Sequence, residues 1–89
     1  MPVPSEKPRA GHSDVLAEVA EVVRLVTGRP VADVQPDRTF VDDLRIDSLA
    51  MVEILEGTRV RMEVGIDDED AKGFVKVDDL VSYLQNRLA

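Results

Sequence analysis

Aliphatic residues recur at intervals of three, four and seven in three separate segments of the chain, and this spacing constrains the fold more than any other feature. On a helix, such spacing places apolar side chains along one stripe that faces a core. The stripes consist of Val15, Val19, Val22, Val23 and Val26 in the first segment, Met51, Ile54, Leu55, Thr58 and Met62 in the second, and Val77, Leu80, Val81, Leu84 and Leu88 in the last. No segment alternates apolar and polar residues convincingly, as a half-buried strand would, so we predict an all-α fold.

Capping and turn residues set the expected limits of the first and third helices. Ser13 or Asp14 can cap the first helix, because their side-chain oxygens accept from the free N–H groups of an opening turn. Gly28 tolerates a left-handed closing conformation and Pro30 cannot continue the ladder, so the first helix should end there. The acidic run at 67–71 predicts a short third helix with carboxylates at its positive end.

A long connection at 28–47 precedes the second helix, which we expect from 48 to about 64. A structureless loop of this length is unusual in a small domain. We therefore expect a short helical turn in it and anchoring by its apolar residues, which are Val31, Val34, Phe40, Val41, Leu44 and Ile46. The predicted architecture is a small four-helix bundle with three longer helices, one short third helix and a long first loop.

The chain has 89 residues, which suffices for one domain but not for two. Three prolines and a glycine predict a flexible tail over residues 1–12, which includes His12, and a folded domain over 13–89. The tail has no apolar run that could act as a signal peptide or membrane span. We therefore expect no membrane insertion and a cytoplasmic protein.

Composition excludes several classes of function. The formal net charge of −7 argues against nucleic-acid binding and favours partners with basic surfaces. The absence of cysteine excludes disulfides, thiol catalysis and cysteine metal sites. The carboxylates at 42–47 and 67–70 lack the alternating ligands and central glycine of a calcium loop, so we predict no metal site.

One hydroxyl, that of Ser48, stands where the long connection gives way to the second helix. Asp47 is the stronger cap, which would leave this hydroxyl free at the first helical position. His12 is the only histidine and lies in the expected tail, so a hydrolytic triad has no base. A phosphodiester on this oxygen would sit near the unpaired N–H groups of the helix start. From the residues alone, a cap or surface serine is the simpler explanation.

Two apolar residues next to Ser48 lie off the stripe of the second helix. At about 100° per residue, Leu49 and Val52 lie about 100° or more from its core face. They are available to a partner, although single exposed apolar side chains are also normal on protein surfaces.

The segment FVDDLRIDSLAMVEIL at 40–55 resembles the acyl carrier proteins, the small acidic four-helix proteins of fatty-acid and polyketide synthesis. The resemblance covers about residues 14 to 86, and the first half looks like actinobacterial carriers, particularly those of mycolate-type chain elongation. It implies an acyl carrier domain over 13–89 that is not an enzyme. Ser48 would bear 4′-phosphopantetheine, donated by coenzyme A through a phosphopantetheinyl transferase. The thiol of this arm would hold growing acyl chains as thioesters in fatty-acid or related long-chain or polyketide synthesis.

The resemblance also implies roles for other residues of the second helix. Asp47 would help the transferase hold magnesium and orient the serine. Leu49, Val52, Glu53 and Glu56 would face the transferase and the synthase enzymes, which are acyltransferase, ketosynthase, reductases and dehydratase. The acyl chain would slip between the helices of a monomer, along Met51, Ile54, Thr58, Met62 and Ile66.

Three arginines depart from the family pattern. Arg45 stands where glycine is common and would pair with the attached phosphate or with an acidic patch on a partner. Arg59 and Arg61 bring positive charge into a helix whose later turns are usually acidic. Two alternatives therefore stay open: a helical interaction module that works without the arm, and a peptidyl carrier of nonribosomal peptide synthesis. The latter usually has glycines just before the serine, which this chain lacks.

Overall fold

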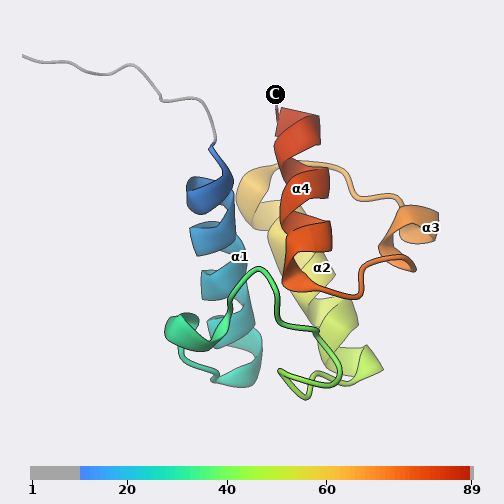
Figure 1. Cartoon of the computed structure of the whole chain (residues 1–89). Coiled ribbons are helices and arrows are strands. Elements are labelled where there is room, and N and C mark those ends of the chain that lie inside the picture. Colours follow the sequence, from blue (N-terminus) through green and yellow to red (C-terminus); the bar gives the residue numbers. More distant parts are fainter. Residues whose placement is uncertain (1–10, 89) are drawn as a thin grey trace, which may run out of the picture.

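The computed structural model describes residues 11–88, and the regular elements within this range are all helical (Figure 1). They are, in order, α1 (His12–Thr27), the 3₁₀ turn η1 (Val31–Asp33), α2 (Ser48–Met62), α3 (Asp68–Ala71) and α4 (Val77–Leu88). The only extended pairing in this range is an isolated bridge between Thr39 and Lys76. The predicted all-α bundle, with three longer helices and a short third one, is confirmed.

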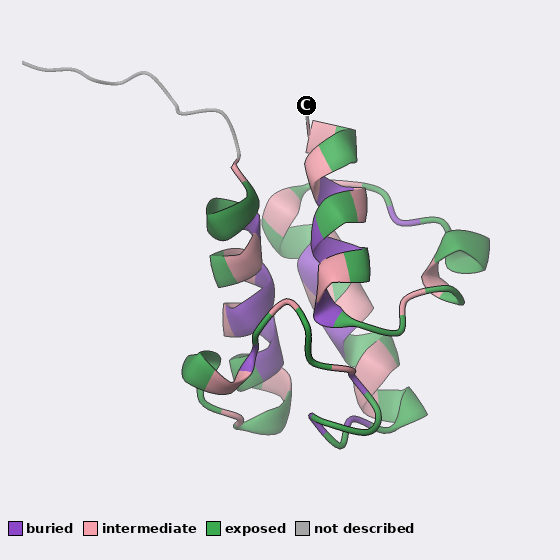
Figure 2. Cartoon of the chain, in the orientation of Figure 1, coloured by how far each residue is buried: buried purple, intermediate pink, exposed green. Residues whose placement is uncertain are grey.

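Helix α1 packs against both α2 and α4. The short α3 lies at the side of the bundle formed by these three helices (Figure 1). The apolar stripes face inward, as Figure 2 shows by the buried surfaces of α1, α2 and α4. Fifteen apolar residues form one buried core, and Phe40 is its single aromatic ring. The core of this domain is therefore almost entirely aliphatic, as the low aromatic content requires.

The apolar stripe of α2 is buried less evenly than those of α1 and α4. Ile54 and Thr58 are fully buried, but Met51, Leu55 and Met62 are only half-buried. The Thr58 hydroxyl donates to the Ile54 carbonyl at 2.8 Å, so this buried polar side chain is satisfied within its own helix.

The start of α1 differs from the prediction. Gly11 occupies the N-cap position, and the Asp14 carboxylate accepts from the Gly11 N–H at 3.4 Å. Asp14 therefore acts as the acid at the third helical position, and not as the cap. His12, expected in the tail, is the first residue of α1, and its Nε2 lies 2.6 Å from the Asp78 Oδ1 of α4. The rest of the expected tail, residues 1–10, lies outside the described residues.

The ends of the other helices follow simple capping rules. Gly28 closes α1 with φ of 82°, as predicted, and α2 ends at Met62, about two residues earlier than expected, with Glu63 at φ of 52°. The Asp67 carboxylate caps α3 by accepting from the Glu69 N–H at 2.8 Å. At the start of α4, Oδ2 of Asp79 accepts from the backbone N–H groups of Val75 and Lys76, each at 2.9 Å.

The long connection is anchored as predicted, but by four of the six expected residues. Val34, Phe40, Leu44 and Ile46 are buried, whereas Val31 and Val41 are exposed, and the prediction for those two is wrong. Val31 opens the η1 turn and Val41 lies at the outside of the turn over 39–44, so neither faces the core.

A reciprocal pair of hydrogen bonds closes the turn over 39–44. The Thr39 N–H donates to Asp43 Oδ2 at 2.8 Å, and the Asp43 N–H donates to Thr39 Oγ1 at 3.0 Å. The first of these bonds holds the pKa of the Asp43 carboxyl below its usual range. The Leu44 N–H also donates to the Thr39 carbonyl at 3.0 Å, so the turn leads directly into the buried Leu44.

Gly57 has a packing reason for its place inside α2. A β-carbon there would lie 3.1 Å from Cγ1 of Val22, so the glycine lets α1 and α2 approach closely. Arg61 of α2 pairs with Glu18 of α1 across the same interface. The helix propensity lost at Gly57 is the cost of this close contact.

We expect Gly57→Leu to lower the free energy of unfolding by about 1 to 3 kcal/mol, because the new side chain would overpack the α1–α2 contact. Urea denaturation followed by circular dichroism measures this change. Gly65→Leu is the control, because a β-carbon at Gly65 meets no atom within 4 Å. We expect its effect to stay within about 0.5 kcal/mol. Equal losses in both variants would contradict the packing explanation.

Candidate functional site

Ser48 is the first residue of α2 and is exposed. Asp47 precedes it in an extended conformation, and its Oδ1 accepts from the Ala50 N–H at 2.8 Å. The prediction that Asp47 caps the helix is therefore confirmed. Among the described residues, no hydrogen bond engages the Ser48 hydroxyl, so the cap leaves it free to react.

The segment before Ser48 is held firmly in the core. Leu44 and Ile46 are buried, and the Ile46 N–H donates to the Phe40 carbonyl at 2.9 Å. Ile46 is thus fixed by its side chain and by its backbone, two residues before the exposed serine. This anchoring gives the hydroxyl a defined position although it belongs to the end of a long loop.

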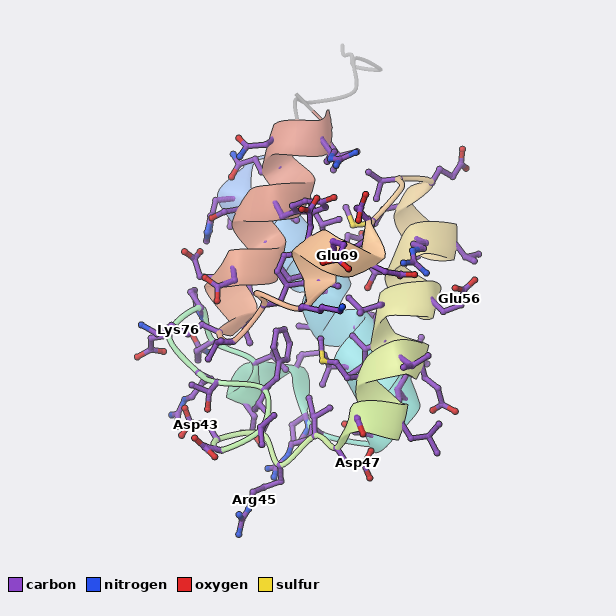
Figure 3. The ribbon with its side chains drawn as sticks, turned by 90° about the vertical axis from the view of Figure 1, so that its right-hand side faces the viewer. Asp43, Arg45, Asp47, Glu56, Glu69 and Lys76 are labelled. Carbon is purple, nitrogen blue, oxygen red and sulfur yellow. The ribbon has the colours of Figure 1, made fainter. Side chains whose placement is uncertain are left out.

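Arg45 lies between these two buried residues and adopts φ of 57°. Its side chain is exposed and extends away from the bundle (Figure 3). A left-handed conformation costs a residue with a β-carbon about 1 to 2 kcal/mol. Glycine, which the resemblance leads us to expect at this position, would avoid that cost. Within residues 11–88, Arg45 forms no ion pair.

The start of α2 provides the electrostatic setting of the site. The N–H groups of Ser48 and Leu49 have no intrahelical partner, because they belong to the first turn. Such groups stabilise an anionic ester oxygen. The imidazole of His12 contacts the carboxylate of Asp78 in α4. It is therefore not positioned to act as a base for Ser48.

The outward face of α2 combines apolar and acidic side chains. Leu49 and Val52 are 69% and 62% exposed, and Glu53 and Glu56 are exposed beside them. Figure 3 shows Glu56 pointing outward from the helix. Val60 is 70% exposed and follows Leu49 by eleven residues, so it belongs to the same face. The helical projection that singled out Leu49 and Val52 would also have found Val60.

The two unusual arginines of α2 are used inside the domain. Arg61 pairs with Glu18 of α1. Arg59 donates to Glu56 Oε1 at 3.2 Å and to Asp68 Oδ1 at 2.8 Å, and its hydrogen bond with Asp68 raises the pKa of its guanidinium. Both positive charges therefore have acidic partners within the chain, and one partner of Arg59, Glu56, belongs to the outward face itself. Glu53 has no ion pair among the described residues, so the outward face keeps one unpaired acidic charge.

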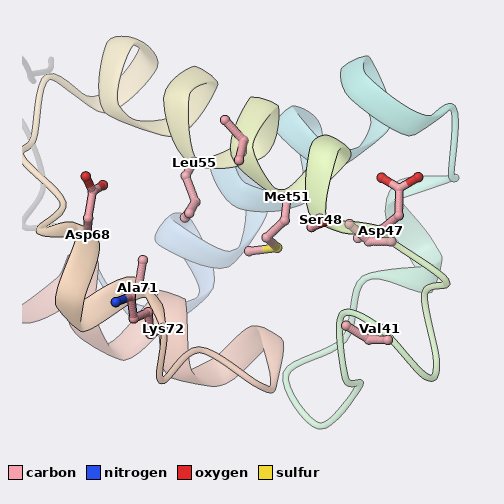
Figure 4. A pocket seen from close by; sticks show the side chains of 10 residues that line it. Val41, Asp47, Ser48, Met51, Leu55, Asp68, Ala71 and Lys72 are labelled. Atoms are coloured by element: carbon pink, nitrogen blue, oxygen red, sulfur yellow. The ribbon is translucent and has the colours of Figure 1, made fainter.

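An apolar groove of about 420 Å³ begins beside Ser48 and runs between α2 and α3 (Figure 4). Its α2 wall is formed by Met51, Val52 and Leu55. The opposite wall is formed by Ala71 at the end of α3 and by Lys72, the residue after it, and the side at the long connection is closed by Val41 and Ile46. The half-burial of Met51 and Leu55 is explained by this opening.

Only one of the five residues that the resemblance implied as acyl-chain contacts lines the groove. Met51 lines it, whereas Ile54, Thr58 and Ile66 are buried in the core and Met62 is half-buried outside it. The sequence reasoning missed the α3 wall, since nothing local indicates which residues of α3 face α2.

Comparison with known proteins identifies the family. The family model described as "Phosphopantetheine attachment site" matches residues 17–84. The chain is 45% identical over 76 residues to the meromycolate extension acyl carrier protein of Mycolicibacterium aurum, with 85% of this chain and 78% of that protein covered. The acyl carrier protein of Rhodococcus erythropolis is 44% identical over 74 residues, with 83% and 81% covered. That of Acidothermus cellulolyticus is 40% identical over 73 residues, with 82% and 87% covered.

The chain belongs to the acyl carrier protein family. Acyl carrier proteins carry acyl groups on 4′-phosphopantetheine for separate enzymes and are not catalysts themselves. They interact with a phosphopantetheinyl transferase and with fatty-acid synthase enzymes. Within residues 11–88, no group of three or more histidine, cysteine or acidic side chains is placed to hold a metal ion. None of the helices described for this acyl carrier protein is long and apolar enough to cross a bilayer.

The surroundings of Ser48 fit 4′-phosphopantetheine. The hydroxyl is exposed and free, the first turn of α2 offers N–H groups to a phosphate, and the groove beside the serine offers an apolar volume to a chain. When bound, the group supplies a thiol that holds an acyl chain as a thioester. A carrier without cysteine can take part in thiol chemistry in this way.

We expect Arg45→Gly to raise the free energy of unfolding of the acyl carrier protein by up to about 1 kcal/mol, because glycine adopts the left-handed conformation without steric cost. Urea denaturation of the protein before attachment of the arm measures the gain. Arg45→Gln removes the same charge but keeps the β-carbon, so it should bring no such gain. A gain with glutamine as large as that with glycine would contradict the conformational explanation.

Proposed function

We propose that Ser48 is the attachment site of the phosphopantetheine arm and that this acyl carrier protein carries growing chains in fatty-acid or related long-chain synthesis. The observation that supports the site most directly is the cap, because Asp47 takes the role that a serine at a helix start usually has. The names of the mycobacterial relatives, which refer to meromycolate extension, support a long-chain pathway. A polyketide pathway would use the same chemistry.

In the proposed transfer, Ser48 Oγ attacks the phosphorus that bears the pantetheine group in the pyrophosphate of coenzyme A and forms a phosphodiester bond with it. The pyrophosphate P–O bond breaks, adenosine 3′,5′-bisphosphate leaves, and the serine proton passes to a base outside this chain. Asp47 stands beside the reacting oxygen, with Oδ1 fixed on the Ala50 N–H. Its other oxygen is then available to the magnesium that the transferase brings. The carrier thus contributes a positioned oxygen and a positioned carboxylate.

We assign the outward face of α2 to enzyme docking. Leu49 and Val52 supply apolar contact, and Glu53 and Glu56 supply charge for basic surfaces on the transferase and on the acyltransferase, ketosynthase, reductases and dehydratase of a synthase. Arg45 extends from the same end of the molecule and would meet an acidic group of a partner.

We assign the groove beside Ser48 to the acyl chain, with Met51 and Leu55 as its contacts along α2. The buried Ile54 and Thr58 then support this wall from the core side, and the chain need not displace them. The proposal places the carrier in the cytoplasm as a monomer, together with the enzymes that load it.

Incubation with coenzyme A and a broad-range phosphopantetheinyl transferase should raise the intact mass of the wild type by one phosphopantetheinyl group. Ser48→Ala should gain nothing, because the accepting oxygen is gone. Ser82→Ala, which removes an exposed serine of α4, should gain as the wild type does. An equal gain on Ser48→Ala, or none on the wild type, would refute the assignment.

Mass analysis of the thioester on protein from its source would separate an acyl cargo from an aminoacyl cargo.

Leu49→Lys and Val52→Lys should each weaken loading by the transferase, with a rise in KM of about tenfold or more, because both remove apolar contact at the centre of the docking face. Leu25→Lys is the control, since Leu25 is also exposed but belongs to α1. Melting temperatures should change little in all three variants. A large fall in melting temperature for Leu49→Lys or Val52→Lys would show that these residues support the fold instead.

A further inference from the structure

The groove has a polar end as well as an apolar length. It begins at Ser48, passes Met51 and Leu55, and reaches Asp68 at the start of α3 (Figure 4). Arg59 follows Leu55 by four residues, so it stands one turn further along the same side of α2. Its Nη2 lies 2.8 Å from Oδ1 of the same Asp68 that lines the groove. The Arg59–Asp68 ion pair is therefore at the far end of the groove, where Asp68 is the partner that lines it.

Arg59 is fixed by three contacts, and only one of them involves Asp68. Its Nη2 also donates to the Ile66 carbonyl at 2.7 Å, and its Nη1 donates to Glu56 at 3.2 Å. Ile66 is buried, so this carbonyl is anchored in the core, and the Arg59 side chain is only 30% exposed. A guanidinium held in this way is a firm boundary, because burying methylene groups against it would remove water from charged groups without replacing their hydrogen bonds.

The same ion pair links α3, which forms the outer wall of the groove, to α2. Helix α3 has only four residues, and side-chain contacts link it to both α2 and α4. On the α4 side, the Tyr83 hydroxyl donates to Asp70 Oδ2 at 2.9 Å and accepts from the Asp67 N–H at 3.2 Å. On the α2 side, the described contacts include Arg59 with Asp68. Arg59 therefore also restricts how far α3 moves from α2.

Building on the proposed function, we propose that Arg59 sets the length of acyl chain that the groove encloses. Eleven residues separate Ser48 from Arg59, which corresponds to about 16 Å of helix. The arm, whose thiol carries the chain, takes up the part of this length that is nearest to Ser48. The part of a chain that fits the remainder is enclosed, and the rest of a longer chain stays in solvent. Met62 and Ile66, which the family resemblance implied as chain contacts, lie beyond this boundary.

The test uses the carrier with its arm attached and loaded with saturated acyl chains of increasing length. Intact mass verifies each loading, and the rate of thioester cleavage by hydroxylamine reports how well the chain is enclosed. In the wild type, protection should rise by up to about fourfold for each methylene buried. It should level off at the length that reaches Arg59.

Arg59→Met keeps an unbranched stem and removes the charge, so protection should continue to rise for longer chains. Arg61→Met is the matched control: it makes the same change two residues away, where the arginine pairs with Glu18 of α1. Its protection should level off at the wild-type length. A plateau at the wild-type length in Arg59→Met, or an equal shift in Arg61→Met, would overturn the role of Arg59.

Arg59→Gln provides a second route in case Arg59→Met does not fold. Its side-chain amide keeps an N–H donor in place of the one that Arg59 gives to the Ile66 carbonyl, and the substitution removes the charge and the ion pair with Asp68. It should extend the plateau to longer chains, by less than Arg59→Met does because the amide is polar, and an unchanged plateau would again overturn the inference.

Failure of the proposed function has different signs. Absence of a mass gain would refute Ser48 as the attachment site, and loading without protection at any length would refute the groove as the chain site. Either result would also overturn the inference about Arg59. A plateau at the wild-type length in the Arg59 variants would overturn the role of Arg59 and leave the proposed function intact.

Discussion

The rest of the site depends on how the connection from α1 to α2 ends, because this segment must fill the core and also present a hydroxyl to solvent. Phe40, Leu44 and Ile46 satisfy the first demand, since all three are buried. The Asp47 cap satisfies the second, because it begins the helix without using Ser48. The chain therefore gives the Ser48 hydroxyl a fixed and exposed position, as the proposed attachment of the arm requires.

Arg45 shows what this arrangement costs. Leu44 and Ile46 both face inward although only one residue separates them, and the backbone between them adopts a left-handed conformation. The family pattern marked arginine as unusual at this position and suggested a charge interaction as the reason. The structure points first to a backbone angle, which a residue type cannot reveal unless that residue is glycine.

Features that depend on residues a few positions apart were predictable from the sequence. The buried stripes of α1 and α4, the Asp47 cap and the closing Gly28 belong to this group. The N-terminal cap of α1 was mistaken because Asp14 is as suitable for the third helical position as for the cap, and Gly11 has no side chain that signals its role. Local pattern alone does not distinguish these two positions.

Features that depend on distant residues were not predictable in this way. The groove needs α3 to lie opposite α2, and the number of residues between them does not fix that distance. Arg59 and Arg61 looked alike in the sequence, as two positive charges that would alter a docking face. In the structure one connects α2 to α3 and the other connects α2 to α1, because their partners Asp68 and Glu18 come from different elements.

The attachment of α3 through side chains has a consequence for how such a carrier can diversify. The helix contributes a wall to the groove but none of the fully buried residues of the core. Substitutions among the few polar groups that fasten it can therefore alter the cavity while the aliphatic interior stays the same. Under the proposed assignment of the groove to the acyl chain, cargo preference and folding stability are to that extent separate traits, and duplicated copies of a gene for such a domain could diverge in the first without losing the second.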